Sequence, residues 1–224
     1  MCGRFTQTQS IPKIAQEFNV AEVSCDLAPS YNIAPTQKVA VIITDGGKQL
    51  VPVRWGFVPS WAKDLSMGSK MINARAETIT EKASYRNAFN KRRCLVVADG
   101  FYEWQDFGDT KRPVYIRLKS GRPFGFAGLY EVWKSPEGKE VTTCTIITTQ
   151  ANELMKPIHE RMPVIISKQD EDMWLDPATD NQGLLLKLLK PYPAEEMEAY
   201  PVSKRVNSPK NNSAACIERL KLPE

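Results

Sequence analysis

Short runs of valine, isoleucine and aromatic residues alternate with turn-forming residues along most of the chain. This pattern predicts a domain built mainly from short β-strands. The clearest pair of strands is predicted at 39–44 and 50–55, because the Asp45-Gly46-Gly47 sequence between them suits a hairpin turn. Further strands are predicted at 94–99, 101–105, 114–118, 124–132, 141–149 and 164–166. The middle of the chain is therefore expected to form a meander.

Helices are predicted to be fewer and shorter than the strands. They are expected at about 11–18, 80–91, 168–175 and 183–190. Pro191 and Pro193 stop the last of them. No repeat, low-complexity stretch or obvious linker divides the sequence. The predicted fold class is α+β: a single domain over residues 1–224, mainly antiparallel β in partly open, barrel-like twisted sheets, with a few short helices.

The overall composition is that of an ordinary globular protein. Of the 224 residues, 42% are hydrophobic and 25% are charged, which excludes disordered, collagen-like and coiled-coil classes. No apolar run approaches the ~20 residues that span a bilayer, and no secretory signal precedes the first strands. We therefore expect a cytoplasmic protein without a membrane partner.

Cysteine and histidine usage predicts neither disulfides nor a metal site. The five cysteines are odd in number and irregularly spaced, and no Cys-x-x-Cys pair occurs. His159 is the only histidine, so a zinc site would have to collect scattered ligands. We expect free thiols, no metal and no cofactor.

The net charge of +4 is too small to indicate a nucleic-acid partner by itself. Its distribution is uneven: residues 51–100 carry nine Lys and Arg against four Asp and Glu, and residues 151–200 carry five against ten. A face that meets an anion would give this polarity, and so would an unevenly charged solvated surface. The charge pattern leaves both interpretations open.

Cys2 carries the sharpest chemical signal, because removal of Met1 would leave one residue with both a free α-amine and a thiol. Their ordinary pKa values, about 7.7–8.0 and about 8.5, give each group a reactive fraction at neutral pH. With an aldehyde, the amine forms an imine and the thiol then closes a thiazolidine ring on the same carbon. The alternative is a small residue that merely follows Met1.

Polar side chains alternate with apolar ones over residues 71–77. In an extended segment this places Asn73, Arg75 and Glu77 on one side. An amide and a guanidinium on one face suit the recognition of a sugar and a phosphate. The polar face of an edge strand is the alternative interpretation.

Two single residues are candidates for proton transfer. Glu103 lies between aromatic neighbours, where desolvation would raise its pKa, although a surface glutamate on a strand is the commoner explanation of this feature taken alone. His159 lies between Pro157 and Pro163, which favours a fixed loop around the only side chain that ordinarily titrates near neutral pH. A packed or surface histidine is the alternative.

Residues 55–61, which end at Trp61, combine aromatic rings with loop-forming residues and precede a basic stretch. Exposed rings beside basic groups suit single-stranded nucleic acid, because bases stack while phosphates meet Lys and Arg. Core packing is the commoner explanation for any one ring. The basic loop at 203–212 is either a further phosphate contact or a solvated tail.

Six segments in a fixed order carry a more specific signal: 1–5, 31–35, 55–61, 73–77, 98–104 and 159–163. With these motifs the sequence resembles the SOS-response-associated peptidase (SRAP) family, whose members are abasic-site processing proteins. The likeness runs over nearly the whole chain, although residues 176–200 match no part of the pattern. It implies one SRAP-like domain whose mature chain starts at Cys2, after autocatalytic removal of Met1.

The resemblance implies a partner, single-stranded DNA containing abasic sites, to which the protein links itself covalently through Cys2. It implies that Asn73 positions Cys2 and the opened deoxyribose, and that Glu103 handles protons during ring opening and imine formation. His159 would assist ring opening and reversal of the crosslink. The link would shield the site from strand cleavage in the DNA-damage (SOS) response, with weak lyase activity as a side reaction.

The resemblance also implies DNA-binding residues. Arg4, Arg75 and Arg161 are expected on backbone phosphates, and Trp61 or its neighbours in the DNA channel. A monomer suffices for this activity, and the bound protein would be associated with the nucleoid. Two rivals remain: an N-terminal-nucleophile cysteine hydrolase that acts on amides with Cys2, and a non-catalytic single-strand binder.

Overall fold

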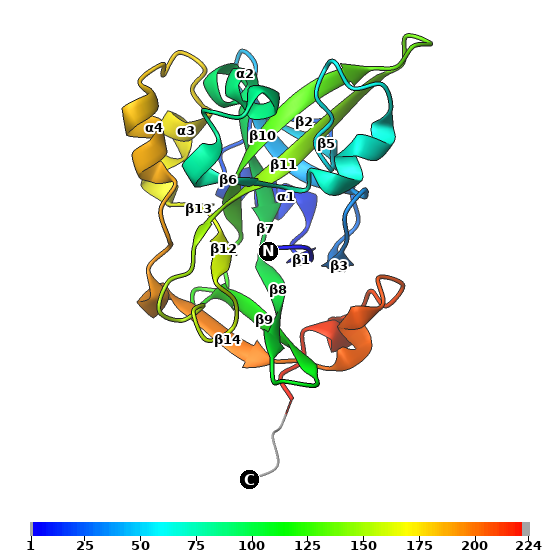
Figure 1. Ribbon diagram of the computed structural model, residues 1–224, viewed down its shortest axis with the longest axis vertical. Coiled ribbons are helices and arrows are strands. Elements are labelled where there is room, and N and C mark those ends of the chain that lie inside the picture. Colours follow the sequence, from blue (N-terminus) through cyan, green and yellow to red (C-terminus); the bar gives the residue numbers. More distant parts are fainter. Residues whose placement is uncertain (1, 221–224) are drawn as a thin grey trace.

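Five strands of the computed structural model, which describes residues 2–220, close into a barrel. They pair in the order β11-β10-β7-β4-β5, and a parallel pairing of β5 with β11 completes the ring. The barrel strands are β4 (Lys38–Thr44), β5 (Lys48–Trp55), β7 (Arg93–Ala98), β10 (Phe124–Lys134) and β11 (Glu140–Gln150). All other pairings in the ring are antiparallel. The upper part of the molecule in Figure 1 is built around this barrel.

Four short strands extend the barrel sheet at its rim. They are β2 (Glu22–Val23), β6 (Asn73–Arg75), β12 (Arg161–Pro163) and β13 (Ile165–Ile166). β2 pairs with β5 and β13 with β10, whereas β6 and β12 both pair with the second half of β11. This half of β11 therefore holds two segments that the sequence separates by about 85 positions.

The second sheet is antiparallel throughout and has the order β14-β9-β8-β1-β3. Its strands are β1 (Phe5–Gln7), β3 (Ser30–Ile33), β8 (Gly100–Asp106), β9 (Lys111–Leu118) and β14 (Met197–Pro201). The chain passes from the barrel into this sheet at Asp99, between β7 and β8. In Figure 1 the start of the chain lies in the middle of the molecule, where the two sheets meet.

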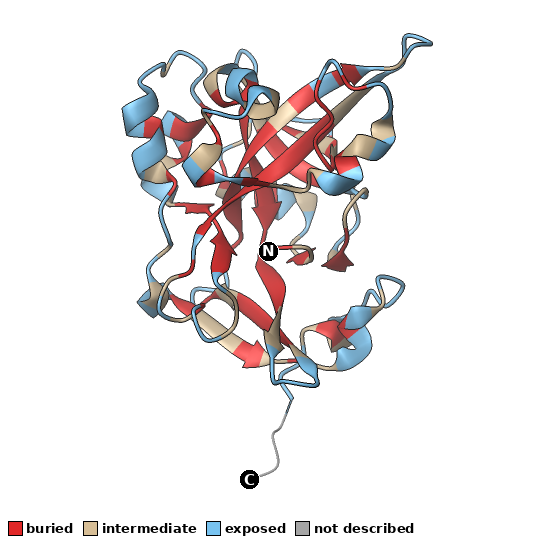
Figure 2. Ribbon diagram, in the orientation of Figure 1, coloured by how far each residue is buried: buried red, intermediate tan, exposed pale blue. Residues whose placement is uncertain are grey.

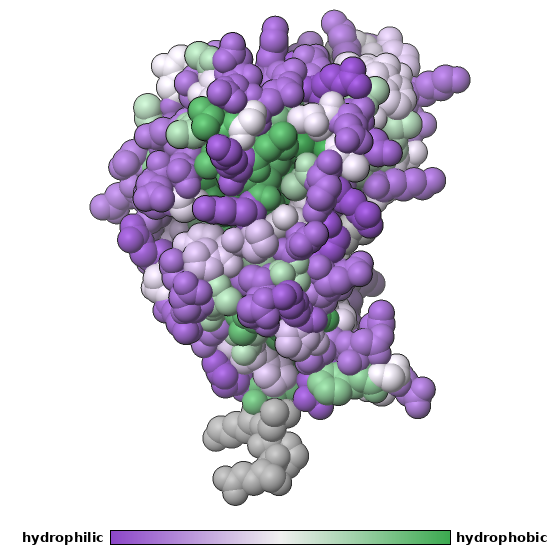
Figure 3. Space-filling model, turned by 60° about the vertical axis from the view of Figure 1, so that its left-hand side comes forward, coloured by the Kyte–Doolittle hydropathy of each residue, from purple (hydrophilic) through white to green (hydrophobic). Residues whose placement is uncertain are grey.

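Helices are short and peripheral. The α-helices are α1 (Ile11–Glu17), α2 (Ala83–Lys91), α3 (Glu171–Leu175) and α4 (Gln182–Leu188). The 3-10 turns are η1 (Leu65–Lys70), η2 (Ala76–Thr78), η3 (Lys168–Asp170), η4 (Ala194–Glu196), η5 (Lys204–Asn207) and η6 (Ala214–Cys216). Met173, Leu184 and Leu186 on α3 and α4 are exposed. Figure 3 turns this side forward and shows a hydrophobic area amid hydrophilic residues.

The barrel strands β4 and β7 are buried on both faces over most of their length, which explains their nearly continuous apolar sequence. Along β4, Val39 and Val41 belong to the core that the barrel shares with the second sheet, whereas Ala40 and Ile42 belong to the core beneath the helices. This is the period of two expected of a strand. β7 alternates in the same way, and Figure 2 shows this strand buried along its length.

The predicted fold class is confirmed, and so is the hairpin at residues 39–55, where Thr44 pairs with Lys48 and Val39 with Val53. The predicted helices lie within a few residues of α1, α2, α3 and α4. The meander is wrong, because β7 pairs with β4 and β10 while β8 pairs with β1 and β9. No helix among residues 2–220 is long and apolar enough to cross a membrane.

Candidate functional site

Asp99 anchors the start of the chain to the junction of the two sheets. One carboxylate oxygen accepts a hydrogen bond from the Thr6 hydroxyl at 2.5 Å. The other accepts from the Thr8 amide at 2.5 Å, the Thr8 hydroxyl at 2.7 Å and the Gln9 amide at 3.1 Å. β1 is only three residues long, so these four bonds help to fix the strand that follows Cys2.

Cys2 lies inside the molecule, in the core shared by the barrel and the second sheet, and has no exposed surface. Its backbone carbonyl accepts a hydrogen bond from the Asn73 side-chain amide at 2.9 Å, and its Sγ lies 3.9 Å from the Arg4 carbonyl. Burial raises the pKa of the Cys2 thiol well above its ordinary value, and the nearby charge of Glu103 raises it further. The thiol is therefore protonated at neutral pH.

Asn73 reaches Cys2 because β6 is fixed to the barrel from two directions. Asn73 is opposite Ile146 in the β6–β11 pairing, and the preceding carbonyl, of Ile72, accepts a hydrogen bond from the Trp55 indole at 2.9 Å. The Asn73 amide oxygen is buried and has no hydrogen-bond partner among residues 2–220. Buried polar atoms are normally satisfied, so this oxygen is an acceptor available to a ligand beside Cys2.

Glu103 lies on β8, opposite Val114 of β9, and is only 3% exposed. Burial raises the pKa of its carboxyl above the usual range. The desolvation that the aromatic neighbours of Glu103 predicted is thus present. A carboxyl group with a raised pKa is suited to donate a proton at near-neutral pH.

His159 ends a tight turn after β11, where its amide donates to the Met155 carbonyl at 2.8 Å. Its Nδ1 accepts a hydrogen bond from the Arg161 amide at 3.0 Å, so the neutral ring carries its proton on Nε2. Burial lowers the pKa of the imidazole. The Gln105 side chain donates to the Pro157 carbonyl at 2.9 Å and ties this turn to β8, the strand of Glu103.

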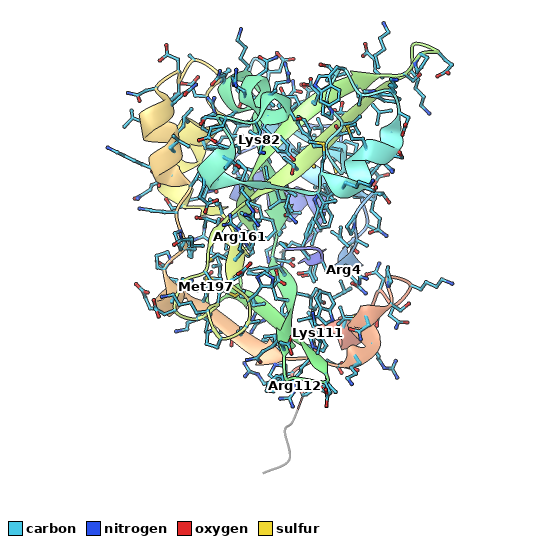
Figure 4. The ribbon with its side chains drawn as sticks, in the orientation of Figure 1. Arg4, Lys82, Lys111, Arg112, Arg161 and Met197 are labelled. Carbon is cyan, nitrogen blue, oxygen red and sulfur yellow. The ribbon has the colours of Figure 1, made fainter. Side chains whose placement is uncertain are left out.

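Arg161 and Arg4 are both engaged by protein groups. Arg161 is 9% exposed and forms a bidentate ion pair with Glu77, with N–O distances of 3.0 and 2.9 Å. This contact lowers the pKa of the Glu77 carboxyl. Arg4 donates to Asn32 at 2.7 Å and to the Val206 carbonyl at 2.8 Å. Figure 4 shows both arginines near the middle of the molecule, with Lys111 and Arg112 of β9 lower down.

Arg75 and Trp61 are the predicted DNA contacts that face solvent. Arg75 is exposed on β6, between the buried residues Ala74 and Ala76, as the alternating pattern predicted. Trp61 is 63% exposed, whereas Trp55 and Phe57 of the same segment are core residues. One ring of that segment is therefore available for stacking.

Sequence reasoning missed the residues that fix the loop at 203–212 beside Arg4. The side-chain amide group of Asn32 donates hydrogen bonds to the backbone carbonyls of Val206, Ser208 and Asn211, at 3.1, 3.0 and 2.8 Å. The Trp104 indole donates to the Asn207 side chain at 2.8 Å. Asn32 and Trp104 both lie within the six segments that carry the family resemblance. No other feature of the sequence pointed to these two residues. No cluster of three potential metal ligands occurs among the described residues.

The family profile described as SOS response associated peptidase (SRAP) matches residues 1–209. The chain belongs to this family. Abasic site processing protein YoqW of Bacillus subtilis is 51% identical over 97% of this chain and 99% of its own length. Abasic site processing protein HMCES of Gallus gallus is 34% identical over 87% of this chain and 67% of its own.

Solved structures share the SRAP fold seen here. A crystal structure of a protein from Bacteroides thetaiotaomicron superposes with a TM-score of 0.90 at 28% sequence identity. The superposition covers 98% of this chain and all of that one. The arrangement of two sheets around the start of the chain is therefore shared beyond closely similar sequences.

Proposed function

We propose that this SRAP protein processes abasic sites in single-stranded DNA by forming a covalent thiazolidine link through Cys2. The proposal rests mainly on the surroundings of Cys2. The Asn73 side chain donates a hydrogen bond to the Cys2 carbonyl, and the buried carboxyl of Glu103 lies close enough to raise the pKa of the Cys2 thiol. The named relatives, which are abasic site processing proteins, support the same substrate.

The first step is hydrolysis of the bond between Met1 and Cys2, which frees the α-amine. An abasic site is a hemiacetal in equilibrium with an open aldehyde. The amine adds to the aldehyde carbon, and loss of one water gives an imine. Glu103, whose pKa is raised by burial, is the group suited to donate a proton to the departing oxygen.

Ring closure follows on the same carbon. A C–S bond forms, the C=N electron pair moves to nitrogen, and the thiol proton ends on that nitrogen. Because the pKa of the Cys2 thiol is raised, this step depends on a base. Neutral His159, whose pKa is lowered, and the Glu103 carboxylate left after imine formation can each accept a proton.

The remaining residues position the substrate. Asn73 fixes Cys2 through one amide hydrogen, and its amide oxygen, which has no hydrogen-bond partner in the described part of the chain, suits a hydroxyl of the opened sugar. Arg75 and Trp61 face solvent and contact phosphate and base. Arg4 and Arg161 offer phosphates the N–H groups that their protein partners leave unused.

The thiazolidine protects the strand because it blocks the β-elimination that breaks an abasic site. The imine that precedes it can itself promote elimination, so a weak lyase activity accompanies the proposal. His159 also assists reversal of the crosslink. We assign this role to the DNA-damage response, with a monomer as the active unit, free in the cytoplasm and on the nucleoid when bound to DNA.

A denaturing gel tests the proposal directly. Protein whose N-terminal residue has been verified by mass spectrometry is mixed with single-stranded DNA that carries one abasic site, and with intact DNA of the same sequence. A covalent band is expected from the parent and from Cys25→Ala, a change at a second buried cysteine. No band is expected from Cys2→Ala. If protein with a free Cys2 forms no band but cleaves peptides, the hydrolase rival replaces the proposal.

A further inference from the structure

A pocket of about 400 Å³ opens on the outer wall of the barrel, away from Cys2. β4, β5, η1 and the start of β11 contribute its walls. Arg54 faces this pocket, whereas the next residue of β5, Trp55, points inward and packs edge-to-face on Phe5 at 5.1 Å. The wall of the barrel therefore separates the pocket from the core that contains Cys2.

Positive charge dominates the lining of the pocket. Lys38, Arg54 and Lys139 line it together with a single carboxylate, Glu140. Between residues 2 and 220, no carboxylate forms an ion pair with any of these three cations. Thr142 adds a hydroxyl group to the wall. Three basic groups from separate parts of the chain thus surround one cavity that holds a single carboxylate.

Lys38 and Arg54 are also direct cross-strand neighbours in the β4–β5 pairing. Residues directly opposite in an antiparallel pair project from the same face, and like charges there are destabilising. An anion between the two side chains would convert this repulsion into attraction. The sheet register therefore points to a bound anion independently of the shape of the cavity.

The backbone beside Arg54 is strained. Thr36 has a φ of 75°, a region that a β-branched residue rarely enters. Its carbonyl accepts a hydrogen bond from Arg54 at 2.7 Å, which helps to hold the loop in this conformation. A guanidinium has five N–H donors, so most of those on Arg54 remain for a ligand. Strain of this kind is typical of functional sites.

We propose that this pocket binds a phosphate group. Tetrahedral phosphate suits a guanidinium, two ammonium groups and a hydroxyl converging on one cavity. Two sources share this chemistry: a phosphodiester of the DNA strand that flanks the abasic site, and free phosphate or a nucleotide. The DNA source rests on the proposed function, whereas phosphate binding as such does not.

Inorganic phosphate and pyrophosphate are the first probes. In amide NMR spectra of the parent, they should shift the signals of Val141 and Thr142. A variant with Lys38→Gln and Lys139→Gln should lose these shifts. A matched variant with Lys13→Gln and Lys187→Gln has the same net charge but alters exposed helical lysines outside the pocket, and it should keep them.

Intact single-stranded DNA, which lacks an abasic site, is the second probe. The logarithm of its binding constant falls linearly with the logarithm of salt concentration, with a slope of about −0.7 per phosphate contact. The pocket variant should lose about 0.7 of this slope relative to the matched variant. Glu140→Gln should tighten phosphate binding about threefold, the change that Coulomb's law gives in water for removing one unit of negative charge at an assumed distance of about 6 Å from the anion.

The outcomes are distinct. Loss of both the NMR shifts and the slope in the pocket variant alone assigns the site to a DNA phosphodiester. Loss of the shifts with an unchanged slope assigns it to free phosphate or a nucleotide. Absence of shifts in the parent, or equal losses in both double variants, overturns the proposal. Failure of the proposed function would appear separately, as no covalent band from abasic DNA with Cys2 free.

Discussion

Replacing Asp99 by asparagine tests whether this carboxylate holds the start of the chain. The side chain keeps its size but loses the charge that four hydrogen bonds now share. Hydrogen bonds to a charged group contribute about 1.5–3 kcal/mol each and neutral ones about 0.5–1.5. The difference is about 1 kcal/mol per bond. Because all four bonds share one carboxylate, their contributions do not add in full. The expected loss in the free energy of unfolding is therefore about 2–3 kcal/mol.

Urea unfolding measures this loss. The free energy of unfolding is expected to fall by about 3 kcal/mol per molar urea, at the upper end for small proteins. With this slope, the loss lowers the urea midpoint of the variant by about 1 M relative to the parent. Asp106→Asn is the control, since Asp106 is exposed and accepts one hydrogen bond, from the Gly108 amide at 2.9 Å. Amide hydrogen exchange should also accelerate in β1, at Phe5 and Thr6. A midpoint within about 0.2 M of the parent would refute the reasoning.

Three further predictions follow from named contacts. Glu77→Gln leaves Arg161 without its charged partner and, because Glu77 is 43% exposed, should cost about 1–2 kcal/mol at pH 7. Because the pKa of Glu77 is lowered in the folded state, that stability begins to fall near the ordinary glutamate value of about 4.3 and is lost as pH falls through the lower folded value. The thermal midpoints of parent and variant should therefore converge with falling pH, and a constant gap would contradict the ion pair. Gly68→Ala brings a Cβ within 2.4 Å of the Gly56 carbonyl oxygen and should cost about 3 kcal/mol in thermal unfolding; an unchanged midpoint would exclude the clash. His159, as the only histidine, gives an unambiguous imidazole NMR signal, whose pKa should lie below 6.5; a value at or above 6.5 would disprove its burial.

The strands were predictable because their hydrophobic pattern is local. Residues 39–43 are apolar at every position, as two buried faces require, and Asp45-Gly46-Gly47 fixed the hairpin. The pairing partners were not predictable in this way. A hydrophobic pattern selects the buried faces of a strand but not its neighbours, so neither the crossing at Asp99 nor the parallel contact of β5 with β11 left a local signal.

The sequence predicted which residues of the candidate site carry reactive groups, but not which residues they contact. Cys2 was singled out by its position and Glu103 by its aromatic neighbours, and the structure gives both buried, with raised pKa values. The partner of Arg161 was hidden, because Glu77 lies 84 positions away in the sequence. Only the pairing of β6 and β12 with the same half of β11 brings these two side chains together.

The burial of Cys2 also determines the order of steps in the proposed mechanism. Burial raises the pKa of the thiol, and a protonated thiol is a poor nucleophile toward an electrophile that arrives from solution. The α-amine, which removal of Met1 frees, must therefore meet the aldehyde first. Once the imine has formed, the thiol attacks a carbon attached to its own residue, and the intramolecular advantage compensates for its low reactivity. A Cys2→Ser variant should thus still reach the imine, which borohydride traps, while giving no stable adduct without it.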